Sequence, residues 1–495
     1  MKKFLSAKIW LKRVLPLLLA LLLCTGCEFP DIRKLWGGAD DTTETPETNN
    51  DPAARQVRLL NGVSIEEYVI VYSDTDPDYS LRAAEYIQSE VKNRTGLELT
   101  LNEDDQPAGS HEIVVGNTNR QISKDLNAKT KNVQFAILAN EASIALEGDY
   151  FIIAAAAYFF VETYVPSEYF DSVIPKETKI HEPIQKEAKN FILLIGDGMG
   201  FNQTLLFEKY DVATEGDLAF SDGEDIFYGY YLPYQGKSRT KSASHDVTDS
   251  AAGGTALATG YKTNNSCVGK DADGNEVQSL TELAGSLGKA TAVFSTEPVT
   301  GATPAAFSSH ANARTDTSVI TSRQTRLKRT YGTIITGELH KWDKFSQENA
   351  KNLQTEITTA LNTLSKDKDG FFMMYEEAFI DQYCHSNKMQ STFNTVVQFN
   401  QAIGLFMEFA FYNPDTFVLI TADHETGGLT KISSGNFTYT SDEHTAENVP
   451  VFAYGYNANV FNNKTIENVQ IPITIAAMMG QDNFGSPDYE SLLKK

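Results

Sequence analysis

The sequence predicts an α/β fold: a mostly parallel central sheet flanked by helices, preceded by a smaller α/β module. Stretches of helical spacing alternate with apolar runs at 191–195, 291–295, 371–375, 417–421 and 451–455. Uninterrupted apolar runs are typical of strands buried on both faces, as in parallel sheets covered by helices. The 495 residues can bury such a core and form a second domain. We place the module at 57–184 and the larger domain at 185–495.

The N-terminus has the pattern of a secretory signal. Residues 1–26 hold a basic segment and then an apolar run from Val14 to Leu23, which is short for a membrane span. Small residues before Cys27 resemble a bacterial lipoprotein cleavage site, which would make Cys27 a lipid anchor; an ordinary secreted protein is the alternative. The polar stretch that follows, up to residue 56, predicts a flexible tether. Either alternative places the mature chain outside the cytoplasm.

Residues 57–184 read as a separate module. Strands are expected at 68–72, 97–101, 112–116 and 143–148; helices are expected at 81–96 and 150–165. The second helix is too short to cross a membrane, so we expect it to be buried. The module weakly resembles small α/β domains that precede the catalytic domains of some glycoside hydrolases. Packing or surface attachment is one interpretation, and glycan binding is the other.

The charge of the chain argues against nucleic acid as a partner. The formal net charge is −23, and removing residues 1–26, which carry five basic residues and no acidic one, leaves −28. Such a surface repels phosphate backbones. The one dense basic stretch, 323–329, predicts a solvated helix face, with steering of a charged substrate as the alternative.

Acids and histidines follow three of the apolar runs. The segments are GDGMG at 196–200, EEAFIDQYCH at 376–385 and ADHETGG at 422–428. Because functional sites of parallel sheets lie beyond the carboxyl ends of the strands, we expect these side chains to meet there. They supply Asp197, Glu376, Asp381, His385, Asp423 and His424, which predict a two- or three-metal site.

A serine completes this pattern. Ser250 begins the segment SAAGGTA, which predicts a helix start, where backbone N–H groups favour a phosphate. A serine beside clustered metal ligands indicates phosphoryl transfer through a phosphoserine. Each residue alone has an ordinary structural explanation, such as a helix cap or a loop residue. These ordinary explanations would have to hold for all of the residues at once, so the functional interpretation is favoured.

The larger domain resembles the alkaline phosphatases over roughly 190–455. The shared motifs are GDGMG, TDSAAGGTALATG (248–260), ATPAAFSSHANAR (302–314), the pair EEAFIDQYCH and ADHETGG, and DEHT (442–445). The resemblance implies Ser250 as nucleophile and Arg314 as phosphate clamp. It also implies one zinc site at Asp381, His385 and His444, a second at Asp197, Asp423 and His424, and a magnesium site at Asp197, Thr303 and Glu376.

The function expected from these residues is hydrolysis of phosphate monoesters by a two-zinc mechanism. Arg314 favours monoesters because they offer more free non-bridging oxygens to a two-pronged guanidinium than diesters do. One alternative is a phosphodiesterase or sulfatase-like member of the same superfamily. Another is a surface glycan-binding protein with an inactive phosphatase domain.

Gly301 departs from the family pattern. The resemblance implies Asp or His two residues before Thr303, and glycine offers no side-chain donor, so the sequence predicts a weak magnesium site that Gly301→Asp would tighten. The segment between Arg314 and Phe371 is short and no crown insertion is evident, so a homodimer is possible but not implied. Cys384 is interpreted as a packing residue, and whether it pairs with Cys267 is left open.

Overall fold

The computed structural model describes residues 56–73, 77–126, 130–208, 226–339, 347–432 and 436–494. The predicted signal, the lipid anchor at Cys27 and nearly all of the tether lie outside these residues. Within them, no helix has the length and apolar character needed to span a bilayer.

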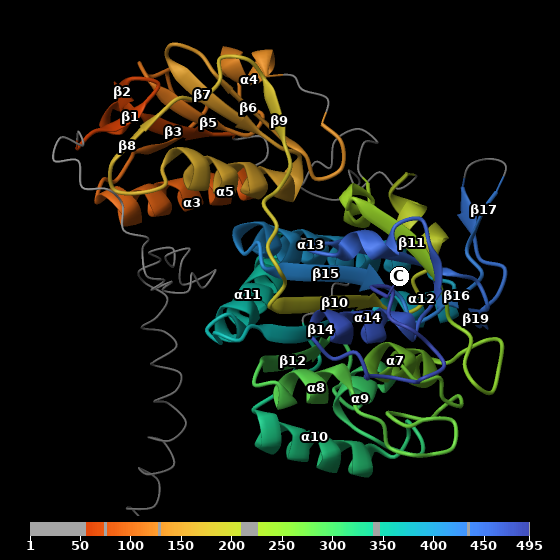
Figure 1. Cartoon of the computed structure of the whole chain (residues 1–495). Helices are drawn as coiled ribbons and strands as arrows, with labels where there is room; N and C mark the ends of the chain where they lie inside the picture. Colours follow the sequence, from red (N-terminus) through yellow and green to blue (C-terminus); the bar gives the residue numbers. More distant parts are fainter. Residues whose placement is uncertain are drawn as a thin grey trace, which may run out of the picture.

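The predicted central sheet is confirmed. Figure 1 shows the sheet of the larger half between helices on both of its faces. It has eight strands in the order β13-β12-β14-β10-β15-β20-β11-β21. The bounds are β10 (Asn190–Gly196), β11 (Tyr234–Arg239), β12 (Ala290–Ser295), β13 (Ile334–Thr336), β14 (Phe371–Glu377), β15 (Thr416–Thr421), β20 (Val449–Tyr454) and β21 (Thr465–Glu467).

Neighbouring strands run parallel except at β20, which is antiparallel to both β15 and β11. All five apolar runs are strands, whereas β11, β13 and β21 were not predicted. β11 is a largely polar segment, YQGKSR, and β13 and β21 are three residues each.

Alternate residues of the buried strands enter two different cores, as the pleat of a strand requires. Leu194 and Tyr375 belong to a cluster with α11 (Gln347–Leu364) and α13 (Met389–Tyr412). Leu193 and Met374 belong to a cluster on the opposite face. That cluster includes residues of α7 (Ser250–Thr259), α8 (Leu280–Ser286), α9 (Ala302–Ser308), α10 (Thr317–Tyr331) and α14 (Gln470–Met478).

The N-terminal half contains a second mixed sheet, in the order β4-β3-β5-β7-β6-β9, and a small sheet β2-β1-β8. The strands are β1 (Arg58–Leu60), β2 (Val63–Ser64), β3 (Val69–Tyr72), β4 (Leu101–Glu103), β5 (Glu112–Val115), β6 (Phe135–Ala139), β7 (Ser143–Glu147), β8 (Phe170–Ser172) and β9 (Lys179–His181). The helices are α3 (Pro77–Thr95), α4 (Gln121–Asp125) and α5 (Ile153–Tyr164). The predicted helix at 81–96 begins earlier, at Pro77, and Gly96 follows its end with φ +77°.

The two halves share one hydrophobic cluster. Helices α3 and α5 lie over α13 (Figure 1), and residues of all three helices belong to the same core. Phe151 stacks on Phe411, and Tyr86 stacks on Tyr412 with ring centroids 4.2 Å apart. The module therefore packs against the face of the larger domain that α13 covers.

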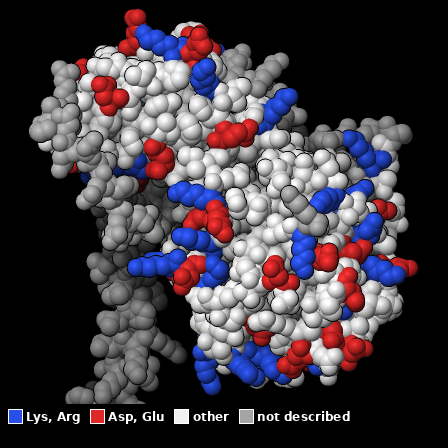
Figure 2. Space-filling model, viewed as in Figure 1, with Lys and Arg blue, Asp and Glu red and all other residues white. Residues whose placement is uncertain are grey.

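The basic stretch 323–329 forms part of α10. Figure 2 shows charges of both signs interspersed on the face drawn, with Lys and Arg gathered over α10 at its lower edge. Arg326, Lys328 and Arg329 are exposed, while Gln324 and Leu327 face the core. This is the arrangement of a solvated helix face.

Candidate metal centre and active site

The carboxyl ends of the central strands deliver the predicted ligands to one place. Asp197 directly follows β10, Glu376 lies near the end of β14, and Asp423 and His424 follow β15. Parallel neighbours end at the same edge of a sheet, so these side chains converge. A short helix after β14, α12 (Phe379–His385), carries Asp381 and His385, and His444 lies in β19 (His444–Thr445).

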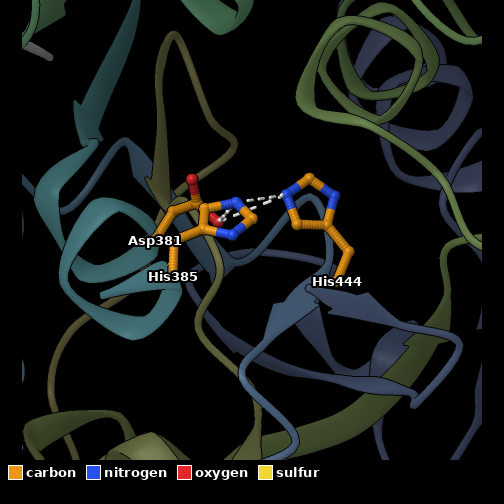
Figure 3. Close-up of side chains that lie close together, drawn as sticks. All are labelled: Asp381, His385 and His444. Carbon is orange, nitrogen blue, oxygen red and sulfur yellow. Dashed lines mark hydrogen bonds and ion pairs between the residues drawn. The ribbon is translucent and has the colours of Figure 1, made fainter. Parts of the chain in front are cut away.

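Asp381, His385 and His444 form one group whose ligand atoms face a common point (Figure 3). The two histidine Nε2 atoms are 3.0 Å apart, and each lies 3.4 Å from Oδ1 of Asp381. Around a tetrahedral zinc ion with ligand distances of about 2.0–2.1 Å, neighbouring ligand atoms are about 3.3 Å apart. The three measured separations fit such an ion.

Backbone contacts fix the two imidazoles of this group. Nδ1 of His385 lies 2.6 Å from the carbonyl of Asp442, and Nδ1 of His444 lies 2.9 Å from the carbonyl of Thr248. A carbonyl only accepts, so each Nδ1 carries a proton and donates it to the carbonyl, which leaves Nε2 of each ring facing the group. The two Nε2 atoms and Oδ1 of Asp381 thus face one another, as ligands of a common cation would. Outer contacts of this kind are typical of histidines that bind metals.

Asp197, Asp423 and His424 form the second group. Nε2 of His424 lies 3.4 Å from Oδ1 of Asp197 and 3.2 Å from Oδ2 of Asp423. Oδ1 of Asp423 accepts from the backbone N–H groups of Gly198 and His424, which leaves Oδ2 to face the group. The Ser250 hydroxyl is 3.2 Å from the same histidine nitrogen.

The buried acids of this region lack sufficient compensation by protein groups. Asp197 Oδ1, Asp423 Oδ2, Glu376 Oε1 and Thr303 Oγ1 are buried without a hydrogen-bond partner. A buried carboxylate oxygen or hydroxyl without a partner is unfavourable, even where the other oxygen of the carboxylate is hydrogen-bonded. The donor set therefore fits bound cations, and imidazole with carboxylate is the combination that zinc accepts.

The electrostatics of the two groups agree with this conclusion. Burial and the neighbouring carboxylates raise the pKa of Asp197 and Glu376 well above the usual range, and that of Asp423 to about 7. Burial and the charge of His444 lower the pKa of His424, so its ring is neutral. Burial acts to raise the pKa of Asp381, but its contacts with histidines and Thr426 outweigh burial and lower it.

Helix α7 presents Ser250 at its first position. Asp249 precedes it in an extended conformation and accepts from the N–H of Ala252, a regular helix cap. A Cβ on Gly253 would lie 3.0 Å from the Cβ of Asp423, and one on Gly254 would lie 3.2 Å from the Cα of Thr303. The two glycines thus allow α7 to approach Asp423 and Thr303 closely.

Arg314 and the remaining predicted donors lie around this helix. Nη1 of Arg314 is 3.5 Å from Oδ2 of Asp249, and the side chain is 37% exposed. The structure therefore leaves the guanidinium beside the Ser250 helix start and accessible. Thr303, in α9, and Glu376 are fully buried.

Two residues at the site were not identified from the sequence as functional. Thr426 donates to Oδ1 of Asp381, and its hydroxyl is 3.2 Å from Nδ1 of His424, so it orients one residue of each group. Glu297, just after β12, places its carboxylate next to Gly301. Burial raises the pKa of Glu297 to about 7, against the opposing charge of Arg314.

Both described cysteines are free. Cys384 is buried, belongs to neither metal-binding group and contacts Gln203, Thr392 and Tyr439, which agrees with a packing role. Burial raises the pKa of its thiol to about 12.

The fold and the site define a class of protein: a mostly parallel sheet, covered on both faces, whose strand ends carry two groups of potential metal ligands beside a serine at a helix start. The chain belongs to the alkaline phosphatase family, whose model matches residues 188–344 and 336–440. Alkaline phosphatase 3 of Bacillus subtilis is 28% identical over 306 residues, covering 52% of this chain and 65% of the relative. The Escherichia coli alkaline phosphatase is 26% identical over 391 residues, covering 55% of this chain and 82% of the relative.

Solved structures show the same relationship. The alkaline phosphatase of the Antarctic bacterium TAB5 has 26% sequence identity and a TM-score of 0.52, covering 61% of this chain and 100% of that chain. A variant of it, with one histidine replaced by aspartate, holds magnesium in a site called M3. The chain spans just under two thirds of the length of the two Bacillus subtilis relatives.

Proposed function

We propose that this protein hydrolyses phosphate monoesters to an alcohol and inorganic phosphate through a phosphoserine at Ser250. The observation that carries the proposal is the position of Ser250 Oγ, 3.2 Å from the His424 nitrogen that also faces Asp197 and Asp423. A serine hydroxyl among buried ligand atoms at a helix start is placed to become an activated nucleophile. Family membership supports the same activity.

Two zinc ions and one magnesium ion are the cofactors we propose. Asp381, His385 and His444 would hold one zinc, and Asp197, Asp423 and His424 the other. Thr303 and Glu376, with Asp197, would hold magnesium, because hydroxyl and carboxylate oxygens are the donors this ion prefers. When bound, the two zinc ions supply positive charge that stabilises the attacking and leaving oxygens of an in-line displacement.

The covalent steps balance without a protein general acid. Ser250 Oγ loses its proton to solvent and attacks phosphorus; the bond from phosphorus to the ester oxygen breaks, and the alcohol leaves with a proton from solvent. A water molecule then attacks the phosphoserine, the bond between Oγ and phosphorus breaks, and Oγ regains a proton. The N-terminus of α7 favours the phosphate in both steps.

Arg314 supports a monoesterase. A guanidinium makes two parallel hydrogen bonds to two non-bridging oxygens, and a monoester offers three such oxygens and more charge than a diester. Its 37% exposure and its place beside Asp249 leave it able to turn toward a phosphate at the start of α7.

The test is turnover by purified, zinc- and magnesium-loaded protein of an aryl phosphate, a bis-aryl phosphate and an aryl sulfate. We expect the monoester to be the preferred substrate, and a phosphorylated peptide containing Ser250 after quenching in acid. Higher turnover of the diester or the sulfate would overturn the proposal and indicate a phosphodiesterase or sulfatase-like member of the superfamily.

A glycan-binding protein with an inactive phosphatase domain is the alternative of another class. The complete set of ligands argues against it, and the packing of the N-terminal half onto α13 gives that half a structural role. Metal analysis separates the two hypotheses: fewer than two zinc ions per chain, with no chelator-sensitive activity, would favour the binding protein.

We further propose an extracytoplasmic location, supported by the secretion pattern at the N-terminus. A lipid on Cys27 would hold the chain at a membrane. Replacing Cys27 with serine should then move the protein from the membrane fraction to the soluble fraction, whereas an ordinary secreted protein would be soluble with either residue.

A further inference from the structure

The space beside Gly301, into which a larger residue would extend its side chain, is filled in the structure. Gly301 is the cap residue before α9, with φ −58° and ψ 163°, a conformation that any residue can adopt. A Cβ built on it would lie 1.8 Å from Oε1 and 2.5 Å from Oε2 of Glu297. The Glu297 carboxylate therefore occupies the space where a side chain at position 301 would begin.

Backbone contacts hold Glu297 in this place. Its N–H donates to Oγ of Ser295 at 3.0 Å, and its carbonyl accepts from the N–H of Glu338 at 2.8 Å. The same Ser295 hydroxyl donates to Oε2 of Glu376. Glu297 and Glu376 are thus tied to one serine, at the ends of the neighbouring strands β12 and β14.

The oxygens around this point have too few partners within the protein. Oε1 of Glu376 and Oγ1 of Thr303 belong to fully buried residues, and neither has a partner among the described residues at hydrogen-bond distance and angle, although Thr303 is close enough to act on the pKa of Glu376. The Glu297 carboxylate fills the space beside Gly301, two residues before Thr303, and after burial its charge is the next cause that raises the pKa of Glu376. Arg314 is the cation that acts on Glu297, and its side chain is paired with Asp249. Such a set of hard oxygens fits a magnesium ion.

We propose that Glu297 is an oxygen ligand of the magnesium site formed with Asp197, Thr303 and Glu376, and that it replaces the donor missing at Gly301. The inference rests on the proposed metal content but concerns a residue of this chain outside the family motifs. It revises the expectation from the sequence, because the site then has four protein donors instead of three. Gly301→Asp should displace Glu297 rather than add a ligand.

The test measures magnesium binding to zinc-loaded protein without substrate, by calorimetric titration and by metal content after dialysis. Glu297→Gln should weaken magnesium affinity by about 10-fold or more, the scale on which residues that tune a metal site act. Glu338→Gln is the matched control, since Glu338 is exposed and contacts Glu297 through its backbone. It should bind magnesium as the unmodified protein does.

A rescue experiment guards against a merely structural effect. Glu297→Ala should bind magnesium weakly, Glu297→Ala with Gly301→Asp should regain affinity, and Gly301→Asp alone should remain near the unmodified protein. Unchanged affinity in Glu297→Ala, together with tighter binding in Gly301→Asp alone, would overturn the proposal. Ser250→Ala should keep normal magnesium affinity, so a failure of the phosphoserine mechanism would be seen separately from a failure of this inference.

Discussion

The hydroxyl oxygen of Ser250 lies 3.2 Å from Nε2 of His424, a nitrogen that also faces carboxylate oxygens of Asp197 and Asp423. The contact looks like that of a serine with its general base, but two features argue otherwise. Nδ1 of His424 contacts the hydroxyl of Thr426 and not a carboxylate, and the pKa of His424 is lowered. The imidazole therefore fits a ligand of a shared cation better than a proton acceptor.

Ser250→Ala should remove the phosphoenzyme and most of the monoesterase rate. We expect kcat to fall by ~10²-fold or more, because only direct attack by water remains. Zinc content should be unchanged, since the three ligands of each group remain. Ser286→Ala, at an exposed serine of α8 whose hydroxyl bonds only within its own helix, is the control. Near-normal turnover in Ser250→Ala would rule out the covalent route.

Arg314→Ala should have a milder effect than Ser250→Ala. The loss of a charge-assisted contact is worth about 1.5–3 kcal/mol, which is ~10- to 150-fold in kcat/KM. Inhibition by inorganic phosphate should weaken in parallel, and the preference for monoester over diester should fall. Arg314→Lys should keep the charge but lose the two-pronged contact. Its kcat/KM should therefore lie between that of Arg314→Ala and that of the unmodified protein. An unchanged phosphate inhibition constant in Arg314→Ala would contradict the clamp.

The convergence of the candidate ligands could be predicted from the sequence because they belong to local motifs at strand ends. Asp197, Asp423 and His424 directly follow strands, and their convergence follows from the rule that parallel strands end at one edge. Glu297 could not be predicted in this way. Its proximity to position 301 depends on how the turn after β12 folds back, and this turn is held by Ser295 and by the backbone of Glu338.

The fold was predictable for a similar reason and to a similar extent. Strands buried on both faces have a clear apolar signal, whereas the edge strands β13 and β21 are short and β11 is largely polar. The direction of β20 depends on the path of the chain from β19, which periodicity does not encode. Packing of α3 and α5 on α13 likewise depends on tertiary contacts between segments far apart in sequence.

In the metal-free protein, the free energy of unfolding should fall as the pH rises. Asp423 and Glu297 have a folded-state pKa of about 7, against ordinary values of 3.8 and 4.5, and the pKa of Asp197 and Glu376 is also raised. Between roughly pH 4.5 and 7 the folded protein then binds more protons than the unfolded chain, so each unit of pH lowers the free energy of unfolding. His424 acts in the opposite sense below about pH 6.5, but the four carboxyl groups outnumber it.

The measurement is the melting temperature of chelator-treated and metal-loaded protein across this range. We expect the metal-free protein to lose thermal stability steadily from acid to neutral pH. The metal-loaded protein should gain stability relative to it, since the ligands bind metal only when deprotonated. A metal-free melting temperature that stays level or rises toward neutral pH would show that these carboxyl groups are compensated in some other way.

The contact between the N-terminal half and the catalytic half includes a buried ion pair. Arg82 of α3 donates to both carboxylate oxygens of Glu408 of α13 at 2.9 and 3.0 Å, with 14% and 1% of the side chains exposed. Burial acts to lower the pKa of the Arg82 guanidinium, but the charge of Glu408 outweighs burial and raises it. Burial also raises the pKa of Glu408, although the charge of Arg82 acts to lower it. The pair is therefore desolvated at a cost and depends on both partners.

Glu408→Gln should destabilise the protein strongly, because it leaves the Arg82 charge between two packed helices without its partner. Removing one member of a buried pair costs about 3–5 kcal/mol, whereas an exposed pair contributes about 1 kcal/mol or less. Glu98→Gln is the matched control, as it breaks the exposed pair Lys92–Glu98 in the same half of the chain. Chemical denaturation of the two variants gives the comparison, and the double replacement Arg82→Met with Glu408→Met should be milder than Glu408→Gln alone. If Glu408→Gln unfolds at the same denaturant concentration as Glu98→Gln, the pair does not hold the two halves together and the apolar contacts of α13 suffice.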